Sequence, residues 1–291
     1  MELFLGKPRF IGLILFLIFS SIAPGKLPFF ARAADQDPTV NDEGVTVNVA
    51  RWFYWGQTAD DLSGILKKDN ARFNKLRVED PNVPTFAASL VENTGFYGTP
   101  WWWYYGQTAQ QVGQLLSQNS ARLISVDPYF TSGGLRFAVV MVPNTGTHDR
   151  AWWWYYGQSA QQVGQLLSQN NARLVELRPY NDNGQLVFAV IMISNTGEDD
   201  ERWEWWYGES IDFINTRIQT GLRVVALAPD PFGNWCAILD EADNFSWWWW
   251  YGQSGNQVLS NIGAHNSRLI DLSSYEDNGN RVYAVVELGL Q

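Results

Sequence analysis

The sequence predicts an α/β repeat protein built from five strand-helix-strand-strand units. Five aromatic runs each end in a glycine, and these glycines are Gly56, Gly106, Gly157, Gly208 and Gly252. Successive glycines are 50, 51, 51 and 44 residues apart, and an arginine follows each of them after 15 or 16 residues. A fixed period of this length indicates a duplicated supersecondary unit whose copies bury their apolar faces by stacking on one another.

We expect the five units to close into a propeller-like ring, with an open solenoid as the alternative. An open solenoid needs polar terminal repeats, and neither end repeat is markedly more polar than the others. The strand-like residues 45–49 could complete the closure by pairing with the last unit. The fourth repeat is the shortest and the most divergent, so we expect it to form the seam or a special face of the ring.

The N-terminal residues are predicted to lie outside the fold. Lys7 and Arg9 precede an apolar stretch over residues 11–22, and the small residues of 31–33 resemble a signal-peptidase site. We therefore interpret residues 1–33 as a signal peptide, with an uncleaved anchor as the alternative, and the polar residues 34–44 as a flexible leader. The mature chain is expected to be secreted, periplasmic or at the cell surface, with no transmembrane span.

A single domain is predicted over residues 45–291. Its repeats span about 46–100, 101–151, 152–202, 203–246 and 247–291. Removal of the signal peptide would take away four basic residues and one acidic residue. The chain would then have 16 basic and 29 acidic residues instead of 20 and 30. An acidic surface repels phosphate backbones, so nucleic acid is not an expected partner. Cys236 is the only cysteine, so no intrachain disulfide can form.

The third repeat illustrates the elements of the unit in order. Residues 152–156 are predicted to form a strand that Gly157 ends, and Ser159 and Gln162 have the spacing of a capping box at a helix start. Apolar residues at helical spacing follow, and the helix is expected to stop at residues 170–171. Residues 173–177 and 186–193 are predicted to be two strands of a hairpin, because the Asn-Gly pair at 183–184 tolerates positive φ.

The aromatic positions divide into two sets when the repeats are compared. The residue before each glycine and the residue two positions earlier are always aromatic, and we expect them to form the packed interior. These residues are Trp55, Tyr105, Tyr156, Tyr207, Tyr251, Phe53, Trp103, Trp154, Trp205 and Trp249. The position four before the glycine accepts a carboxylate in one repeat, which indicates proximity to solvent. We therefore predict that a ligand contacts this position, which is held by Trp52, Trp102, Trp153, Glu204 and Trp248.

The repeated arginines are expected to be structural. They are Arg72, Arg122, Arg173, Arg223 and Arg268, each at the start of the second strand of its unit. Simple alternation places Arg173 on the same face as Val175 and Leu177, and a buried guanidinium needs partners such as tryptophan rings, carbonyls or carboxylates. An arginine-lined anion site is the alternative.

The motifs of the repeat resemble a known family. They are Trp-Trp-Trp-Tyr-Tyr-Gly at 101–106 and 152–157, a Ser- or Thr-capped helix, Ala-Arg-Leu at 121–123 and 172–174, and Phe-Ala-Val at 137–139 and 188–190. The pattern resembles the tandem repeat of bacterial repeat proteins and of the N-terminal half of secreted fungal polyglycine hydrolases. The resemblance implies that the catalytic residues of those hydrolases lie in a separate serine-β-lactamase-like domain. We find no motif of such a domain in this sequence. The strand order is also similar, after circular permutation, to the propeller of the pentein enzymes.

Few residues of the sequence suggest catalysis. The two histidines, His148 and His265, and the lone Cys236 show no metal-ligand spacing, so no metal and no cofactor is expected. Cys236 occupies the position of alanine in sister repeats, which indicates a buried filler rather than a nucleophile. Acidic runs at 198–201 and 240–243 could chelate calcium, but solvated loops are the expected interpretation because the runs lack an EF-hand spacing.

Together these observations favour a secreted, non-catalytic repeat domain that binds an extracellular polysaccharide or protein through aromatic surfaces. Tryptophan rings suit sugar rings and extended peptides, because they offer flat apolar area at little cost in entropy. Two alternatives stay open. One is a purely structural scaffold for protein interactions, and the other is a hydrolase with an unrecognised carboxylate pair or a pentein-like cysteine site.

Overall fold

The computed structural model describes residues 50–95, 98–146, 149–242 and 245–290. The predicted signal peptide (1–33), the leader (34–44), the strand-like residues 45–49 and His148 lie outside these described residues. No helix within the described ranges is both long enough and apolar enough to cross a membrane.

The predicted strand-helix-strand-strand unit is confirmed in all five repeats. The first strands are β1 (Arg51–Thr58), β4 (Trp102–Gln107), β7 (Trp152–Gln158), β10 (Trp203–Glu209) and β13 (Trp247–Gln253). The helices are α1 (Ala59–Lys68), α2 (Ala109–Asn119), α3 (Ala160–Asn170), α4 (Ile211–Ile218) and α5 (Gly255–His265). The second strands are β2 (Ala71–Asp80), β5 (Ala121–Thr131), β8 (Ala172–Asp182), β11 (Leu222–Pro229) and β14 (Ser267–Asp277). The third strands are β3 (Thr85–Glu92), β6 (Gly134–Pro143), β9 (Gln185–Ser194), β12 (Trp235–Glu241) and β15 (Asn280–Gly289). A short 3₁₀ helix, η3 (Gly197–Asp199), precedes β10.

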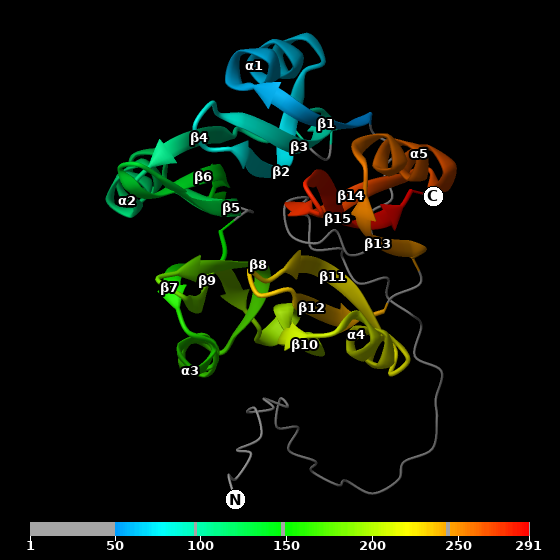
Figure 1. Ribbon diagram of the computed structural model, residues 1–291. Helices are drawn as coiled ribbons and strands as arrows, with labels where there is room; N and C mark the ends of the chain where they lie inside the picture. The colour runs from blue at the N-terminus through cyan, green and yellow to red at the C-terminus, as the bar shows by residue number, and fades with distance from the viewer. Residues whose placement is uncertain (1–49, 96–97, 147–148, 243–244, 291) are drawn as a thin grey trace, which may run out of the picture.

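Each unit forms its own three-stranded sheet with the third strand in the middle. The first and second strands both pair antiparallel with the third, so they run parallel to each other and the helix connects them. Figure 1 shows the five units arranged around a common axis, with the second strands toward the axis and the helices on the outside. We therefore call the first, second and third strands of a unit its outer, inner and middle strands.

The helices begin where the capping residues predict. Thr58, Thr108, Ser159 and Ser254 each accept a hydrogen bond from the third helical N–H, and the side chain at that third position accepts one from the backbone N–H of the cap. In the fourth unit Ser210 caps α4 without the reciprocal bond. The third helix ends at Asn170, and Asn171 follows it in the left-handed conformation with φ of 47°. Local sequence therefore determines both ends of these helices.

Aromatic contacts join each unit to the next. The middle strand of one unit carries an aromatic ring that packs edge-on against the outer strand of its neighbour. These pairs, with their centroid separations, are Phe86–Tyr105 (5.2 Å), Phe137–Tyr156 (5.3 Å), Phe188–Tyr207 (6.0 Å), Trp235–Tyr251 (5.4 Å) and Tyr283–Phe53 (5.3 Å). The last pair connects the fifth unit to the first.

This packing corrects the prediction that the ten repeated aromatic positions form the interior. Among them only Phe53 is fully buried, while Tyr105, Tyr156 and Tyr251 are 38%, 41% and 46% exposed. The outer strand is an edge strand, and this face of it is covered by the neighbouring sheet rather than by the unit's own helix. The neighbouring middle strand covers the last aromatic residue of the outer strand only in part, through one edge-on ring, and leaves the rest of that residue exposed.

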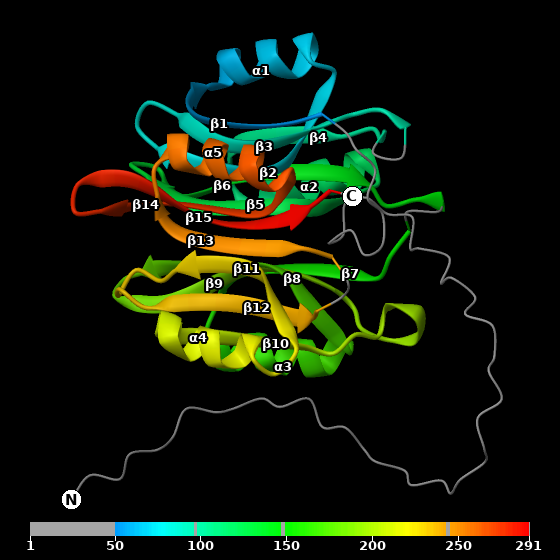
Figure 2. The same ribbon diagram turned by 90° about the vertical axis from the view of Figure 1, so that its right-hand side faces the viewer.

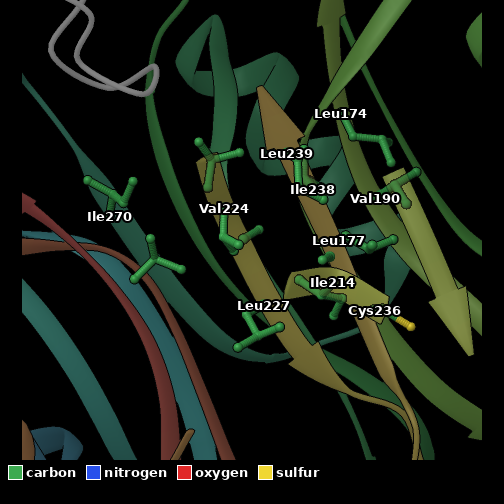
Figure 3. Packing of buried hydrophobic residues seen from close by; sticks show 14 of the residues in the cluster. Leu174, Leu177, Val190, Ile214, Val224, Leu227, Cys236, Ile238, Leu239 and Ile270 are labelled. Carbon is green, nitrogen blue, oxygen red and sulfur yellow. The ribbon is translucent and has the colours of Figure 1, made fainter. Parts of the chain in front are cut away.

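The apolar core fills the spaces between sheets and helices. Its largest cluster runs from the third unit through the fourth into the fifth, and includes Leu174, Val190, Ile214 and Leu239 (Figure 3). Helical residues such as Val163 of α3 and Ile214 of α4 are completely buried against the strands of their units. Burial of these side chains contributes on the order of 2 kcal/mol each to stability.

A bulge in each inner strand changes which residues share a face. In β8 the register shifts between Leu174 and Glu176, so Val175 has no direct partner on β9. Arg173, Glu176 and Arg178 consequently lie opposite Ile193, Ile191 and Ala189, which are alternate residues of one strand. The expectation that Arg173 shares its face with Leu177 is therefore wrong. Arg173 lies on the same face as Glu176 and Arg178 because the bulge inserts one extra residue.

Candidate binding site on the central axis

Two rows of inner-strand residues meet at the axis, one residue from each unit. The residues three positions after the repeated arginines are Lys75, Ser125, Glu176, Ala226 and Asp271. The residues five positions after them are Arg77, Asp127, Arg178, Ala228 and Ser273. Unlike the aromatic positions, these rows differ in chemistry from one unit to the next. We call the ionic residues Lys75, Arg77, Asp127, Glu176, Arg178 and Asp271 the axial network.

Glu176 is the centre of the axial network. Its carboxylate is completely buried and accepts hydrogen bonds from Arg77 Nη2 at 2.7 Å and Arg178 Nε at 2.9 Å, and it also pairs with Lys75. Arg178 also pairs with the fully buried Asp271, which lies 3.5 Å from Arg77 Nη2. The first and third units thus contribute the cations and the central anion, and the fifth contributes Asp271. Buried charges require this degree of pairing.

Glu176 and Asp127 of the axial network have pKa values that are shifted in opposite directions. Burial alone would raise the pKa of Glu176, but Arg178, Lys75 and Arg77 outweigh it and hold the pKa far below its ordinary value. Burial raises the pKa of Asp127, and the opposing effect of Arg77 does not cancel the shift. Three cations face three carboxyl groups, so the axial network carries no net charge when all of them are ionised.

Part of the axial chemistry is structural, because the inner strands are edge strands. Asp127 accepts a hydrogen bond from Val78 N at 2.8 Å, and Asp271 accepts one from Leu227 N at 2.9 Å. In the reverse sense, Arg77 Nε donates to Leu272 O at 2.6 Å. Side chains of one unit therefore satisfy the free backbone groups of the next, as buried polar groups require.

A pocket of about 700 Å³ opens above the axial network. It lies at the end of the molecule where the inner strands turn into the middle strands, which we call the hairpin end. Arg77, Asp127, Arg178 and Ser273 line its floor. Its walls are the aromatic residues Trp235, Tyr251 and Tyr275 and four prolines, namely Pro128, Pro179, Pro229 and Pro231. The hairpins β11–β12 and β14–β15, which bound it, lie together at one end of the molecule in Figure 2. We call this space the axial pocket.

The pocket exists because the inner hairpin of the fourth unit is short. Its inner strand β11 has 8 residues, whereas β5, β8 and β14 have 11 each. The Asp230 carboxylate holds the tight turn that follows by accepting from Phe232 N and Asn234 N. The missing residues leave the space that the neighbouring hairpins enclose. This agrees with the expectation that the fourth unit has a special face.

The aromatic wall of the axial pocket is held in place by its own contacts. Trp235 meets Tyr251 and Tyr275 edge-on, with centroids 5.4 Å and 5.7 Å apart. The Tyr275 hydroxyl accepts a hydrogen bond from Gly252 N at 2.8 Å, which fixes its ring against the outer strand. Tyr251 is 46% exposed, so one side of the wall is free to contact another molecule.

The predicted ligand-contact tryptophans do not meet in one site. Trp52, Trp102, Trp153 and Trp248 are half-buried, each on the outer strand of a different sheet. None of them lines the axial pocket. Trp52 packs with the cluster that contains Leu62 and Leu66 of α1, so the face with these residues carries the helix of the unit.

Glu204, the carboxylate at the same repeat position, already has partners within its unit. It pairs with Arg217 through contacts of 2.6 Å and 2.9 Å and accepts a hydrogen bond from Trp206 Nε1 at 3.0 Å. Arg217 also lies over the Trp206 ring, 5.4 Å from its centroid. These contacts explain how one repeat accepts a carboxylate where the others have tryptophan.

The five repeated arginines are all buried, with exposed fractions between 0% and 4%. Arg173 pairs with Glu201 and Arg223 with Asp240, each at 2.9 Å. Arg72 donates to the carbonyl of Phe73 at 3.3 Å. Their positions leave them outside the lining of the axial pocket.

Cys236 and His265 lie in different environments. Cys236 is completely buried in the largest apolar cluster and lies opposite Ala228, in the position of Ala138 and Ala189 of other units (Figure 3). His265 stacks on Trp248 with 4.2 Å between ring centroids, and its Nδ1 lies 3.0 Å from Glu287 Oε2. The buried Glu287 also accepts from Ser267 Oγ at 2.6 Å. Within the described ranges, no group of three or more His, Cys, Asp or Glu residues could hold a metal ion.

Sequence reasoning missed the axial network and the axial pocket. The available signal was a charged residue three or five positions after a repeated arginine, within a strand that otherwise has a buried apolar pattern. Lys75, Glu176 and Asp271 all satisfy this description. Charged residues at buried strand positions need partners, so charges of both signs in different repeats indicate a shared polar centre.

Comparisons with known proteins support the resemblance found from the motifs. A family model described as "polyglycine hydrolase-like, structural repeat" matches residues 98–144 and 149–195. These matches cover the second and third units, and they confirm that the chain is similar to the repeat half of the polyglycine hydrolases. A search of curated proteins found no significant match.

Proposed function

We propose that this chain is a secreted, non-catalytic repeat domain in which five units close into a propeller-like ring and bind a neutral oligosaccharide in the axial pocket. The observation that carries the proposal is the combination of an aromatic and proline wall with a floor of paired guanidinium and carboxylate groups. The sequence led us to expect a polysaccharide or a protein as the ligand, and we propose the polysaccharide class. The contact residues are those of the pocket instead of the tryptophans four before each glycine.

The charge of the axial network supports a neutral ligand. An anion would meet Asp127 on the floor and Glu276 and Asp277 at the rim of the pocket. A cation would meet Arg77 and Arg178 on the floor, and the six ionic groups of the axial network cancel overall. Sugar hydroxyls both donate and accept hydrogen bonds, so they suit a floor that offers both kinds of group. The flat apolar face of a sugar ring suits the exposed side of Tyr251 and Trp235. A volume of about 700 Å³ is in the range of small-molecule sites.

Contacts between the fifth and first units support the closed ring. Tyr283 packs edge-on against Phe53 as Phe137 packs edge-on against Trp154 at the same repeat position, with centroid separations of 5.3 Å and 5.6 Å. Asn74 Nδ2 donates to Leu269 O at 2.7 Å across the same boundary.

The test is calorimetric titration of the mature protein with neutral glucan, xylan, mannan and chitin oligosaccharides. Tyr251→Ala should weaken binding of the ligand that the wild type accepts by at least tenfold, because it removes the most exposed ring of the aromatic wall. Tyr156→Ala is the matched control. Tyr156 holds the same repeat position and is 41% exposed, but it does not line the axial pocket.

Three outcomes contradict the proposal in different ways. Equal losses of binding affinity in Tyr251→Ala and Tyr156→Ala would mean that the ligand binds to the outer strands of several units and not in the axial pocket. Absence of binding throughout the panel would remove the carbohydrate function. Cleavage of the oligosaccharide during the titration, detected by chromatography of the products, would show that the chain is a hydrolase.

A further inference from the structure

We infer that the axial pocket receives the end of an oligosaccharide chain rather than an internal segment. This inference rests on the proposed carbohydrate function and adds the mode of recognition. It follows from two features of the pocket, namely a closed end at the axis and an open end between the fourth and fifth units.

The axis below the pocket is filled with side chains. Glu176, Asp271 and Ser125 are completely buried, and Lys75 is 6% exposed. Arg77 closes the floor by donating to Ser125 Oγ at 2.8 Å and to Leu76 O at 2.7 Å, in addition to its pair with Glu176. A chain that enters from the hairpin end therefore cannot pass through the centre of the molecule.

The other end of the pocket leads outward between two units. Its outer lining consists of the turn of the fourth unit and of Tyr251, Gly252, Glu276 and Asp277 of the fifth unit. These four residues of the fifth unit are exposed. The first sugar would lie at Asp127 and Ser273, and the following sugars would extend over Trp235 and Tyr251 toward solvent.

The floor offers groups that suit a terminal sugar. Asp127 uses Oδ2 to accept from Val78 N, and Ser273 Oγ donates to Leu227 O at 2.8 Å while accepting from Arg178 Nη1 at 2.6 Å. The unused lone pairs of Asp127 are acceptors for the additional hydroxyl that only a chain end carries. Either the reducing or the non-reducing end would bring such a hydroxyl, and the experiment distinguishes them.

The experiment compares three forms of the oligosaccharide that binds best in the panel above. One is unmodified, one has its reducing end converted to the alditol with borohydride, and one carries a methyl ether on the terminal non-reducing 4-hydroxyl. We expect one of the two modified forms to bind at least tenfold more weakly and the other to bind like the unmodified form. The parent polysaccharide should bind in proportion to its number of chain ends, so that partial acid hydrolysis raises the binding capacity of a fixed mass.

A matched pair of variants tests the position of the chain end. Asp127→Asn should reduce the discrimination between the two modified forms, whereas Asp182→Asn, at the end of β8 and outside the pocket lining, should retain it. Equal binding of all three forms, with polysaccharide binding in proportion to mass, would overturn the chain-end inference and leave carbohydrate binding intact. Failure of every oligosaccharide to bind would instead contradict the proposed function itself.

Discussion

The axis and the boundaries between units hold the same five sheets together by different interactions. At the boundaries the same aromatic contact recurs, with a ring of one middle strand against the outer strand of the next unit. At the axis each unit contributes a different residue, and the stability of the arrangement depends on charge pairing around Glu176. A boundary contact can therefore vary in one unit without changing the contacts of the others. At the axis, a change of one residue leaves charged groups of other units without their partner. Of these axial residues, Arg77, Asp127, Arg178 and Ser273 also line the axial pocket.

Removal of the central anion should cause the largest effect at the axis. Glu176→Gln leaves Lys75, Arg77 and Arg178 buried without their shared carboxylate, and loss of one partner of a buried ion pair costs about 3–5 kcal/mol. Urea unfolding monitored by tryptophan fluorescence measures this loss in the free energy of unfolding. The control is Glu241→Gln at the exposed end of β12, which should change stability by less than about 0.5 kcal/mol. A loss below about 1 kcal/mol for Glu176→Gln would mean that the axial charges are solvated in solution.

The contrast between the two regions also explains what the sequence could predict. The order of elements, the capping residues and the hairpins recur in each repeat. Because each local pattern occurs several times, the elements could be predicted correctly from the sequence. Alternation along the outer strand showed correctly that Trp103 and Tyr105 share a face. It could not show that this face meets the neighbouring unit, because that depends on how units pack and not on the strand itself.

The axial pocket was beyond prediction for two physical reasons. The bulge at Val175 and its equivalents shifts the alternation by one residue, so a simple strand pattern places Glu176 on the wrong face. The pocket itself arises from the short turn between Pro229 and Trp235, whose effect depends on the lengths of hairpins from other units. The sequence did identify the fourth repeat as exceptional, and this was the part of the site that could be anticipated.

The boundary between the fifth and first units should respond to a smaller change. A Cβ atom on Gly255 would overlap ring atoms of Trp55, so Gly255→Ala should cost about 1–3 kcal/mol through overpacking. Trp55→Tyr introduces the residue found at Tyr105 and Tyr156, and the double variant should recover most of the loss. Thermal and urea unfolding of the two single variants and the double variant give the coupling free energy.

Gly113 provides the matched control for this substitution. It lies within α2, and a methyl group added there would meet no neighbouring atom within 4 Å, so Gly113→Ala should stabilise the protein by up to about 1 kcal/mol. If Gly255→Ala is as stable as the wild type, or if Trp55→Tyr fails to rescue it, Trp55 does not pack on α5 in solution. This result would contradict the proposed closure of the ring at this boundary.

The smallest expected effect is a difference in pH dependence between two axial carboxyl groups. Burial raises the pKa of Asp127, so the native state binds more protons than the unfolded state between the ordinary carboxyl pKa and the raised one, and stability falls as pH rises through that window. The pKa of Glu176 is lowered, so its contribution has the opposite sign: it is fully present above the ordinary carboxyl pKa and is lost progressively as pH falls below that value. Asp127→Asn should therefore melt above the wild type at pH 7, with a difference that shrinks toward pH 4, while Asp182→Asn should follow the wild type. Melting temperatures across this range measure the effect, and a difference that grows toward acid would show that Asp127 is stabilised as a carboxylate by Arg77 instead of being penalised by burial.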